Sequence, residues 1–327
     1  MIKELLFSGA LLLPMGVVLA NDSMAEIAVG GLVFTKTTDV EMRSEELAIS
    51  EESVDVLYHF YNNGTKLVTS LVAFPMPDIE YSNSQSAVPT HDTENLFGFV
   101  TTVNGKPVTA QIEQKAMVGN VDCSRLLRDL HIPFAPQLKV TDDTLKRLHP
   151  EQIKLLLKAG LVCDLGSDSD HDYAPSWTLK SAYYWEQTFL PKVETVIHHH
   201  YKPAVGGSVE ASSSIGDGNA DPEYDKYGID SNFVEAFKKG KLSSRAKANG
   251  YSRPWSENRI GYILKTGANW AKPIHTFHLV IDKGAPENLL SFRGEKVKKI
   301  SSTKFEMITT NFTPTRDIEI LILKPVK

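Results

Sequence analysis

The chain has 327 residues, of which 42% are hydrophobic and 23% are charged, and its formal net charge is −5 at pH 7. This length and composition are those of a folded globular protein with one large domain or two medium ones, and they exclude a disordered chain. No lysine- or arginine-rich run interrupts the acidic balance, so nothing in the charge pattern indicates nucleic-acid binding.

The first twenty residues have the pattern of a secretory signal peptide. Lys3 supplies a weak positive start, residues 5–20 are apolar and uncharged, and Val18 and Ala20 place small residues before a cleavage point at Asn21. The alternative is an uncleaved anchor, but this run is shorter than the roughly 20 residues of a spanning helix. We therefore expect an exported protein, periplasmic or extracellular, without a transmembrane segment in the mature chain.

The first part of the mature chain has the pattern of β-strands. Residues 27–35 are apolar and β-branched, which predicts one strand. Residues 54–61 alternate between two faces, and turn residues at 62–66 lead into a second apolar run at 67–74. Because Asn-Gly favours the positive φ of a tight turn, this pattern predicts a β-hairpin.

A second hairpin is predicted from residues 97–103 and 108–113, which flank another Asn-Gly turn at 104–106. Two such hairpins in sequence are typical of a sandwich of antiparallel sheets. Residues 177–189 and 193–201 continue the strand pattern after an interruption. The sequence therefore predicts a mainly β protein, with an antiparallel β-sandwich over residues 21–204.

The interruption, at about residues 122–164, has helical periodicity. Asp122 could cap a short helix and Thr141 a second one. Pro150 suits the first position of a third helix, which Gly160 would end. We expect a helical insert of two or three short helices within the sandwich.

The remaining chain divides into a connection and a second β-rich region. Residues 205–230 are rich in Gly, Ser and Asp, which predicts a flexible connection, and residues 231–327 form the second region. This region begins with a possible helix interrupted at Gly240. Whether it is a separate domain or completes the first one stays open. Its predicted strands are 259–265, 274–282, 289–292, 304–310 and 318–323.

Two cysteines, Cys123 and Cys163, flank the helical insert. An even number of cysteines in an oxidising compartment favours a disulfide, so we predict a Cys123–Cys163 bridge. The alternative is two free buried thiols. A third interpretation, a catalytic Cys123 with His131, conflicts with that pairing.

Several motifs, in their order along the chain, resemble the bacterial secreted family named domain of unknown function 4424. The resemblance spans residues 21 to about 325 and implies compartment and architecture but no activity. Residues 50–116, and in part 177–202, are also similar to the non-catalytic β-sandwich modules of vault and inter-α-trypsin proteins. The motifs that carry the family resemblance are NDSMAEIAVGGLVF, VAFPMPDI, FVTTVNGKPVTAQIEQKA, YYWEQTFLPKVETVIHHHYKPAVGG and TNFTPTRDIEILILKP.

Three consecutive histidines at 198–200 are the most conspicuous candidate site. On a strand, alternate residues share a face, so at most His198 and His200 can reach one ion, while His199 faces the largely apolar side with Ile197 and Tyr201. A metal site needs further ligands, and His278 lies far away in the sequence. The alternative is an ordinary half-exposed strand with His199 in the core.

Other candidate sites rest on weaker patterns. Asp168, Asp170 and Asp172 alternate like the start of a calcium loop, but the glycine and glutamate that such a loop requires are missing, as they are in the stretch from Asp217. The aromatic cluster Trp177, Tyr183, Tyr184 and Trp185 suits core packing, or alternatively a platform for a glycan or peptide.

No motif of a hydrolase, a phosphate loop or a nucleotide site is present, so we expect no cofactor. The patterns favour a non-enzymatic exported protein of the cell envelope that binds an envelope protein or a small ligand. The alternative function is a metal-dependent hydrolase or metal-binding protein that uses the His198/His200 face.

Overall fold

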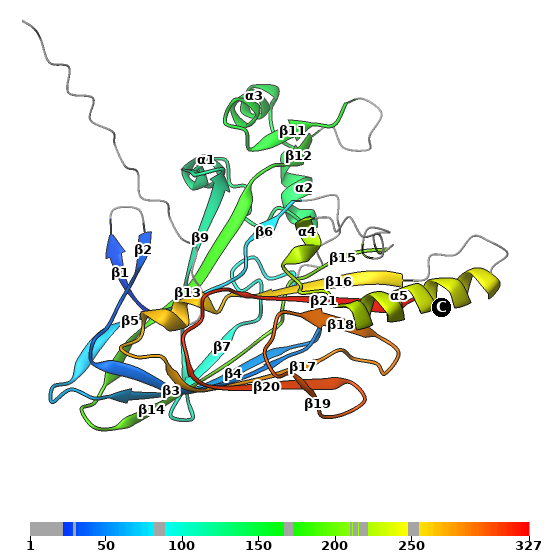
Figure 1. The fold of residues 1–327 in the computed structure, drawn as a ribbon. Coiled ribbons are helices and arrows are strands. Elements are labelled where there is room, and N and C mark those ends of the chain that lie inside the picture. Colours follow the sequence, from blue (N-terminus) through cyan, green and yellow to red (C-terminus); the bar gives the residue numbers. More distant parts are fainter. Residues whose placement is uncertain are drawn as a thin grey trace, which may run out of the picture.

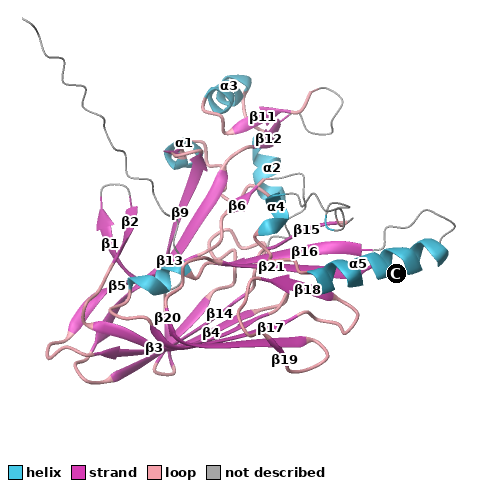
Figure 2. Ribbon diagram, viewed as in Figure 1, coloured by secondary structure: helices cyan, strands magenta, loops and turns pink. Residues whose placement is uncertain are grey.

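The computed structural model shows a mainly β protein with a helical insert (Figures 1 and 2). Three sheets enclose most of the hydrophobic core, as expected from the strand patterns, and the helices lie outside them. The structure describes residues 22–28, 31–81, 89–166, 173–209, 211, 215, 222–247 and 255–326.

Sheet 1 is antiparallel and, within the described residues, has seven strands. Its long strands β9 and β13 extend beyond the rest of the sheet toward the helical insert (Figure 1). The strands, in spatial order, are β10 (Val121–Asp122), β9 (Gln111–Val118), β13 (Thr178–Phe189), β5 (Val68–Pro75), β1 (Ser23–Ala28) and β2 (Gly31–Thr35), with β6 (Ile79–Glu80) beside β13.

Sheet 2 is the largest, with eight strands among the described residues. Its pairs are antiparallel except β17 with β3, which run parallel near its centre. In spatial order its strands are β19 (Lys298–Lys299), β20 (Lys304–Phe312), β17 (Ile274–Asp282), β3 (Val40–Ile49), β4 (Val54–Asn62), β14 (Glu194–Tyr201), β7 (Val100–Val103) and β8 (Lys106–Val108).

Sheet 3 is a smaller antiparallel sheet that lies beside α5 (Ser231–Lys247) (Figure 1). In chain order, the short helix α4 (Pro222–Asp225) lies between β15 and α5, and a 3₁₀ turn, η2 (Lys265–Asn269), lies between β16 and β17. The strands of sheet 3 are β15 (Val205–Ser208), β16 (Trp255–Tyr262), β21 (Ile318–Pro325) and β18 (Leu289–Phe292).

The predicted helical insert is confirmed. It contains α1 (Ser124–Asp129), α2 (Lys139–Leu145) and α3 (Pro150–Lys158), followed by the two-stranded ribbon of β11 (Val162–Asp164) and β12 (Tyr173–Pro175). Pro150 stands at the start of α3 as expected, and Gly160, with φ of 71°, ends it.

One detail of the insert differs from the prediction. Thr141 lies inside α2 rather than before it, and its hydroxyl donates a hydrogen bond of 2.7 Å to the carbonyl of Ala135. The helix begins two residues earlier, after Leu138, whose side chain cannot cap the free N–H groups.

The hairpin predicted over residues 54–74 is wrong. β4 and β5 do not pair: β4 lies between β3 and β14 in sheet 2, whereas β5 lies between β13 and β1 in sheet 1. The connection is a corner between the sheets, built on Asn62, a fully buried residue whose side-chain amide donates to the carbonyls of Lys66 and Phe189 at 2.8 and 2.9 Å. These bonds anchor the turn to sheet 1 instead of returning it beside β4.

The second predicted hairpin is confirmed in part. β7 and β8 pair through the Asn104–Gly105 turn, where both residues have positive φ, as the turn chemistry requires. The return strand ends at Val108, and the chain then crosses to β9 in sheet 1. The single strand predicted over residues 27–35 is wrong as well. The structure has two paired strands there, β1 and β2.

The C-terminal region completes the fold of the N-terminal one. β17 and β20 extend sheet 2 alongside β3, and one hydrophobic cluster runs from Met24 to Ile322. The pairing of β17 with β3 joins the two regions in one sheet.

Candidate functional site

The histidine triplet lies on β14, and the strand divides it as predicted. His199 is fully buried with Ile197 and Tyr201, while His198 and His200 project from the outer face of sheet 2 with exposed fractions of 44% and 47%. The alternation of β14 follows directly from the two-residue period of a strand.

His199 forms a buried pair with Asp22. Its Nε2 lies 3.1 Å from Asp22 Oδ1, and neither side chain has solvent-exposed surface. The rings of Tyr58, Phe74 and Trp185 contact the imidazole, and these apolar surroundings supply little solvation. Burial raises the pKa of Asp22, and the nearby imidazole lowers it in part. The pair belongs to the core, out of reach of a ligand.

Four histidines lie together on the outer surface of sheet 2. His59, His198, His200 and His278 come from three strands, and each is within 3.6 Å of a carboxylate. We call this surface the histidine face, and it comprises these four residues with Glu46, Asp55, Glu194 and Glu306.

Asp55 joins the two histidines that the sequence had singled out. Its Oδ1 lies 2.8 Å from His200 Nδ1 and 3.6 Å from His198 Nε2. β4 pairs with β14 so that His200 stands directly opposite Asp55 and His198 opposite Leu57. The cross-strand register therefore brings one carboxylate between two imidazoles.

The other two histidines have carboxylates of their own. His59 Nδ1 lies 3.1 Å from Glu194 Oε1 across the β4–β14 pair. His278 Nε2 lies 3.0 Å from Glu306 Oε1 across the β17–β20 pair. In each case the strand register, rather than sequence proximity, makes the pair.

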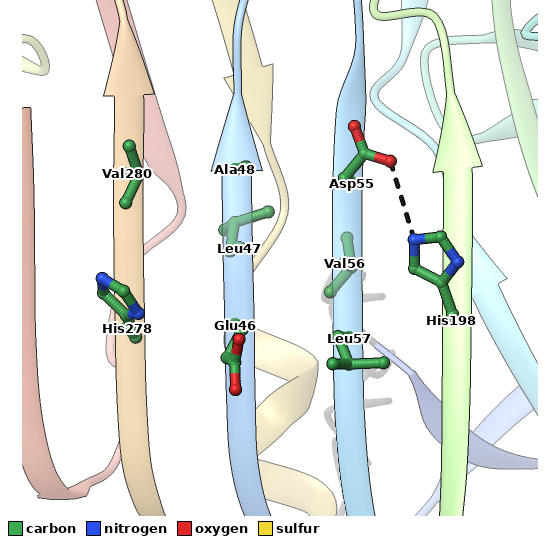
Figure 3. A pocket seen from close by; sticks show the side chains of 9 residues that line it. All are labelled: Glu46, Leu47, Ala48, Asp55, Val56, Leu57, His198, His278 and Val280. Carbon is green, nitrogen blue, oxygen red and sulfur yellow. Dashed lines mark ion pairs between the residues drawn. The ribbon is translucent and has the colours of Figure 1, made fainter. Parts of the chain in front are cut away.

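A shallow hollow of about 240 Å³ crosses the centre of the histidine face. Figure 3 shows its lining on four adjacent strands, with His278 on β17, Glu46 on β3, Asp55 and Leu57 on β4, and His198 on β14. His278, Glu46, Leu57 and His198 lie in one cross-strand row.

The described lining of this hollow has negatively charged side chains but no permanently positive one. Among the described residues that line it, two are carboxylates, two are imidazoles and none is lysine or arginine. A neutral imidazole donates or accepts a hydrogen bond, whereas a protonated one adds a positive charge. The hollow is therefore acidic when its histidines are neutral, and it loses this character when they are protonated.

The predicted metal pair is on one face, but it is not arranged as a metal centre. Within the described residues, no group of three His, Cys, Asp or Glu side chains could hold a metal ion. Asp55, which lies beside the pair, instead accepts a hydrogen bond from the His200 ring nitrogen. His275, at the start of β17, is exposed and does not belong to the histidine face.

The predicted Cys123–Cys163 disulfide is not confirmed: both cysteines are free thiols in the structure. Cys123 immediately precedes α1, whereas Cys163 is held on β11, where its thiol contacts the Ala174 carbonyl at 3.6 Å. The two thiols thus belong to separate elements of the insert. Burial, together with the charge of Asp122, raises the pKa of the Cys123 thiol, which does not favour a nucleophilic role for it.

The remaining sequence candidates fall into two groups. Trp177, Tyr183 and Trp185 are buried in the core, which confirms the packing interpretation, and the Trp177 indole donates to the Phe134 carbonyl at 2.8 Å. Asp168, Asp170 and Asp172 lie outside the described residues, as do residues 217–221 of the acidic stretch 217–225.

Sequence reasoning missed the partners of the histidines. The alternating pattern of residues 54–61 already placed Asp55 and His59 on one face, so this part of the face could have been found. Glu46 and His278 belong to β3 and β17, whose parallel pairing has no local sequence signal.

Comparison with known proteins places the chain in a family. No curated protein matches it. Among solved structures, it is similar to a Legionella pneumophila protein provisionally described as nutrient-binding, with 17% identity over 93% of this chain and 70% of that chain and a TM-score of 0.47. It is also similar to an M1 zinc metallopeptidase from Deinococcus radiodurans, with 8% identity over 88% of this chain and 43% of that chain and a TM-score of 0.25.

At these identities and TM-scores, neither structural similarity assigns a role to this chain. No helix among the described residues has the length and hydropathy of a membrane span. The family model is more decisive, because it matches residues 20–321, most of the 327-residue chain. The sequence resemblance is confirmed, and the chain belongs to the family described as domain of unknown function DUF4424.

Proposed function

We propose that this chain is an exported, non-catalytic binding protein of the cell envelope, and that the histidine face binds a positively charged segment of a partner protein. The observation that carries the proposal is the acidic hollow, which contains Glu46 and Asp55 but no lysine or arginine among its described lining residues. A partner's lysine or arginine would supply the missing positive charge.

The open shape of the histidine face supports binding rather than catalysis. Its histidines are 29% to 47% exposed, and each lies against a carboxylate on the outer surface of sheet 2. Nucleophilic catalysis would require a hydroxyl or thiol within hydrogen-bond reach of an imidazole. In the described part of the chain, none of the four histidines has such a partner.

Export is supported by the apolar run at residues 5–20 and the small residues before Asn21. N-terminal sequencing of the protein from an envelope fraction should begin at Asn21. A chain that still begins at Met1 in the cytoplasmic fraction would contradict export.

A peptide-binding experiment tests the histidine face. Fluorescence anisotropy should show binding of a labelled lysine-rich peptide that weakens as the salt concentration rises. Glu46→Gln combined with Asp55→Asn should weaken binding about tenfold or more. Asp129→Asn, an exposed carboxylate of the insert, is the matched control and should bind like the wild type. Equal binding by all three proteins would exclude the proposed surface.

The second candidate function is metal binding by His198 and His200. Asp55 is the nearest further ligand, with its carboxylate oxygen within 3.6 Å of a nitrogen of each histidine, but among the described residues these three side chains do not form a group that could hold an ion. An ion there would have to displace the Asp55–His200 hydrogen bond. Elemental analysis of the purified protein separates the candidates: stoichiometric zinc that is lost in His198→Ala/His200→Ala would favour the second candidate over the first.

A further inference from the structure

A second and larger hollow lies between sheet 2 and sheet 3, away from the histidine face. Its volume is about 520 Å³, within the range of small-molecule sites. Residues of β20, β18 and β21 and of the connections that follow β18 and β20 line it. It does not share any lining residue with the hollow of the histidine face.

The inner part of this hollow is apolar. Leu264, Met307 and Ile318 are at most 7% exposed, and the rings of Phe292 and Phe312 are half-buried beside them. The Phe312 ring is held in place by stacking on Phe277, with 4.8 Å between ring centroids. Such a floor favours an apolar ligand body, because its contact removes apolar surface from water.

Two of the four charged residues that line the hollow are already neutralised. The Arg293 guanidinium forms an ion pair with Asp225 at 2.7 Å. Asp317 pairs with the Lys265 ammonium at 3.2 Å and also accepts hydrogen bonds from the backbone N–H groups of Leu264 and Lys265. These contacts leave little capacity for a ligand at either residue.

The other two charged residues, Glu295 and Arg316, are exposed, and neither forms an ion pair within the described residues. Glu295 lies on the connection after β18, and Arg316 on the connection from β20 to β21. The hollow therefore offers one negative and one positive charge from different segments, above an apolar floor. A complementary ligand carries one charge of each sign on either side of an apolar body.

From this arrangement we propose that the hollow binds a short apolar peptide with free ends. The peptide ammonium faces Glu295, the carboxylate faces Arg316, and the side chains lie on the floor of Phe292, Met307 and Phe312. Arginine suits the carboxylate because its planar guanidinium can donate two parallel hydrogen bonds. A peptide keeps its two charges apart, whereas a free amino acid carries both on one carbon.

Calorimetric titration of the full mature protein with the dipeptide L-leucyl-L-phenylalanine tests this site. We expect saturable binding that weakens about tenfold or more when either terminal charge is removed from the ligand. N-acetyl-leucyl-phenylalanine lacks the ammonium, and leucyl-phenylalanine amide lacks the carboxylate. Absence of saturable dipeptide binding, or equal binding of the three ligands, would overturn the proposal.

Matched variants connect each ligand charge to its residue. Arg316→Gln should weaken binding of the free dipeptide but not of the amide, and Glu295→Gln should weaken binding of the free dipeptide but not of the acetylated form. Lys304→Gln, an exposed cation that does not line the hollow, should bind like the wild type. Uniform effects of both site variants on every ligand would contradict the assigned contacts.

A bulky substitution at the rim locates the binding. Thr313 is exposed and lines the hollow, so Thr313→Trp should block all three ligands without disturbing the core. An unchanged melting temperature serves as the folding control. If the dipeptide binds this variant as tightly as the wild type, it binds elsewhere and the proposed site is wrong.

Discussion

The core contains a buried ionisable pair, Asp22 and His199, two side chains with no solvent contact that are costly to bury. Their mutual hydrogen bond satisfies one atom of each, but Asp22 Oδ2 and His199 Nδ1 have no hydrogen-bond partner among the described residues. The backbone carbonyl of Asp22 also accepts the Trp270 indole N–H at 2.6 Å. This contact network attaches the segment before β1 to the C-terminal region.

The raised pKa of Asp22 makes a contribution to stability that depends on pH. A carboxyl whose pKa is higher in the folded protein than its ordinary value of 3.8 binds protons more tightly when folded. Its contribution is complete below pH 3.8 and is lost as the pH rises through the folded pKa. As the pH rises above 3.8, the free energy of unfolding of the wild type should therefore fall relative to that of Asp22→Asn, by at most about 1.4 kcal/mol per pH unit.

Urea denaturation at a series of pH values between about 3 and 5 measures this difference in the free energy of unfolding. Asp129→Asn, which removes an exposed carboxylate, is the control and should leave the pH profile nearly unchanged. A wild type that gains stability relative to Asp22→Asn as the pH rises would contradict the raised pKa.

The cysteines allow a direct test of the missing bridge. Because Cys123 and Cys163 lie on separate elements and are free, we expect two titratable thiols in denatured protein that has not been reduced. A thiol-reactive dye measures them, and protein treated with a reductant and then desalted is the control. Detection of no thiol before reduction and two after it would show that the sequence-based disulfide prediction was right.

At the scale of the elements, α5 contains a glycine whose role is steric. A Cβ atom at Gly240 would lie 2.3 Å from Trp255 Cζ2, and the Trp255 indole is held by a 3.2 Å hydrogen bond to the Phe237 carbonyl. Replacing glycine by alanine inside a helix ordinarily stabilises it by about 1 kcal/mol. At Gly240 the clash of the added Cβ with Trp255 should instead make the substitution destabilising.

We therefore expect Gly240→Ala to lower the free energy of unfolding by about 1–3 kcal/mol, the usual cost of overpacking. Thermal and urea denaturation measure it. Lys238→Ala, on the exposed side of the same helix, should change stability by less than about 0.5 kcal/mol. A stabilised Gly240→Ala protein would show that the helix can move away from Trp255.

Local signals predicted the elements better than their partners. The alternation of residues 194–201, the Asn104–Gly105 turn and Pro150 were interpreted correctly, because each depends on geometry within a few residues. The turn at residues 62–66 was misread as a hairpin, because its outcome depends on a distant acceptor, the Phe189 carbonyl. A turn signal shows where the chain bends and not which sheet it enters.

At the scale of the whole molecule, local patterns again do not specify strand partners, and this explains which parts of the candidate sites the sequence could predict. The separation of His199 from His198 and His200 follows from strand periodicity alone. The row of His278, Glu46, Leu57 and His198 depends on pairing between strands that are distant in sequence, above all the parallel β3–β17 pair, whose partners are more than 200 residues apart. Such pairing is not encoded in any local pattern, so the acidic hollow could not be predicted.

The shared core has a consequence for unfolding. Because β17 pairs with β3 inside sheet 2 and Trp270 contacts Asp22, the N-terminal and C-terminal regions should unfold together rather than as two domains. Variants that retain only Trp185 or only Trp270, with the other three tryptophans replaced by phenylalanine, place one fluorescent reporter in each region.

In each single-tryptophan variant, the urea transition measured by fluorescence should coincide with the transition measured by far-UV circular dichroism. The isolated fragment of residues 21–204 should fail to give the near-UV spectrum of a packed core, because it lacks β17 and with it one neighbour of β3. Two separate midpoints, or a fragment that folds cooperatively, would show that the predicted sandwich of residues 21–204 is a domain in its own right. The parallel β3–β17 pair would then be a contact between two domains.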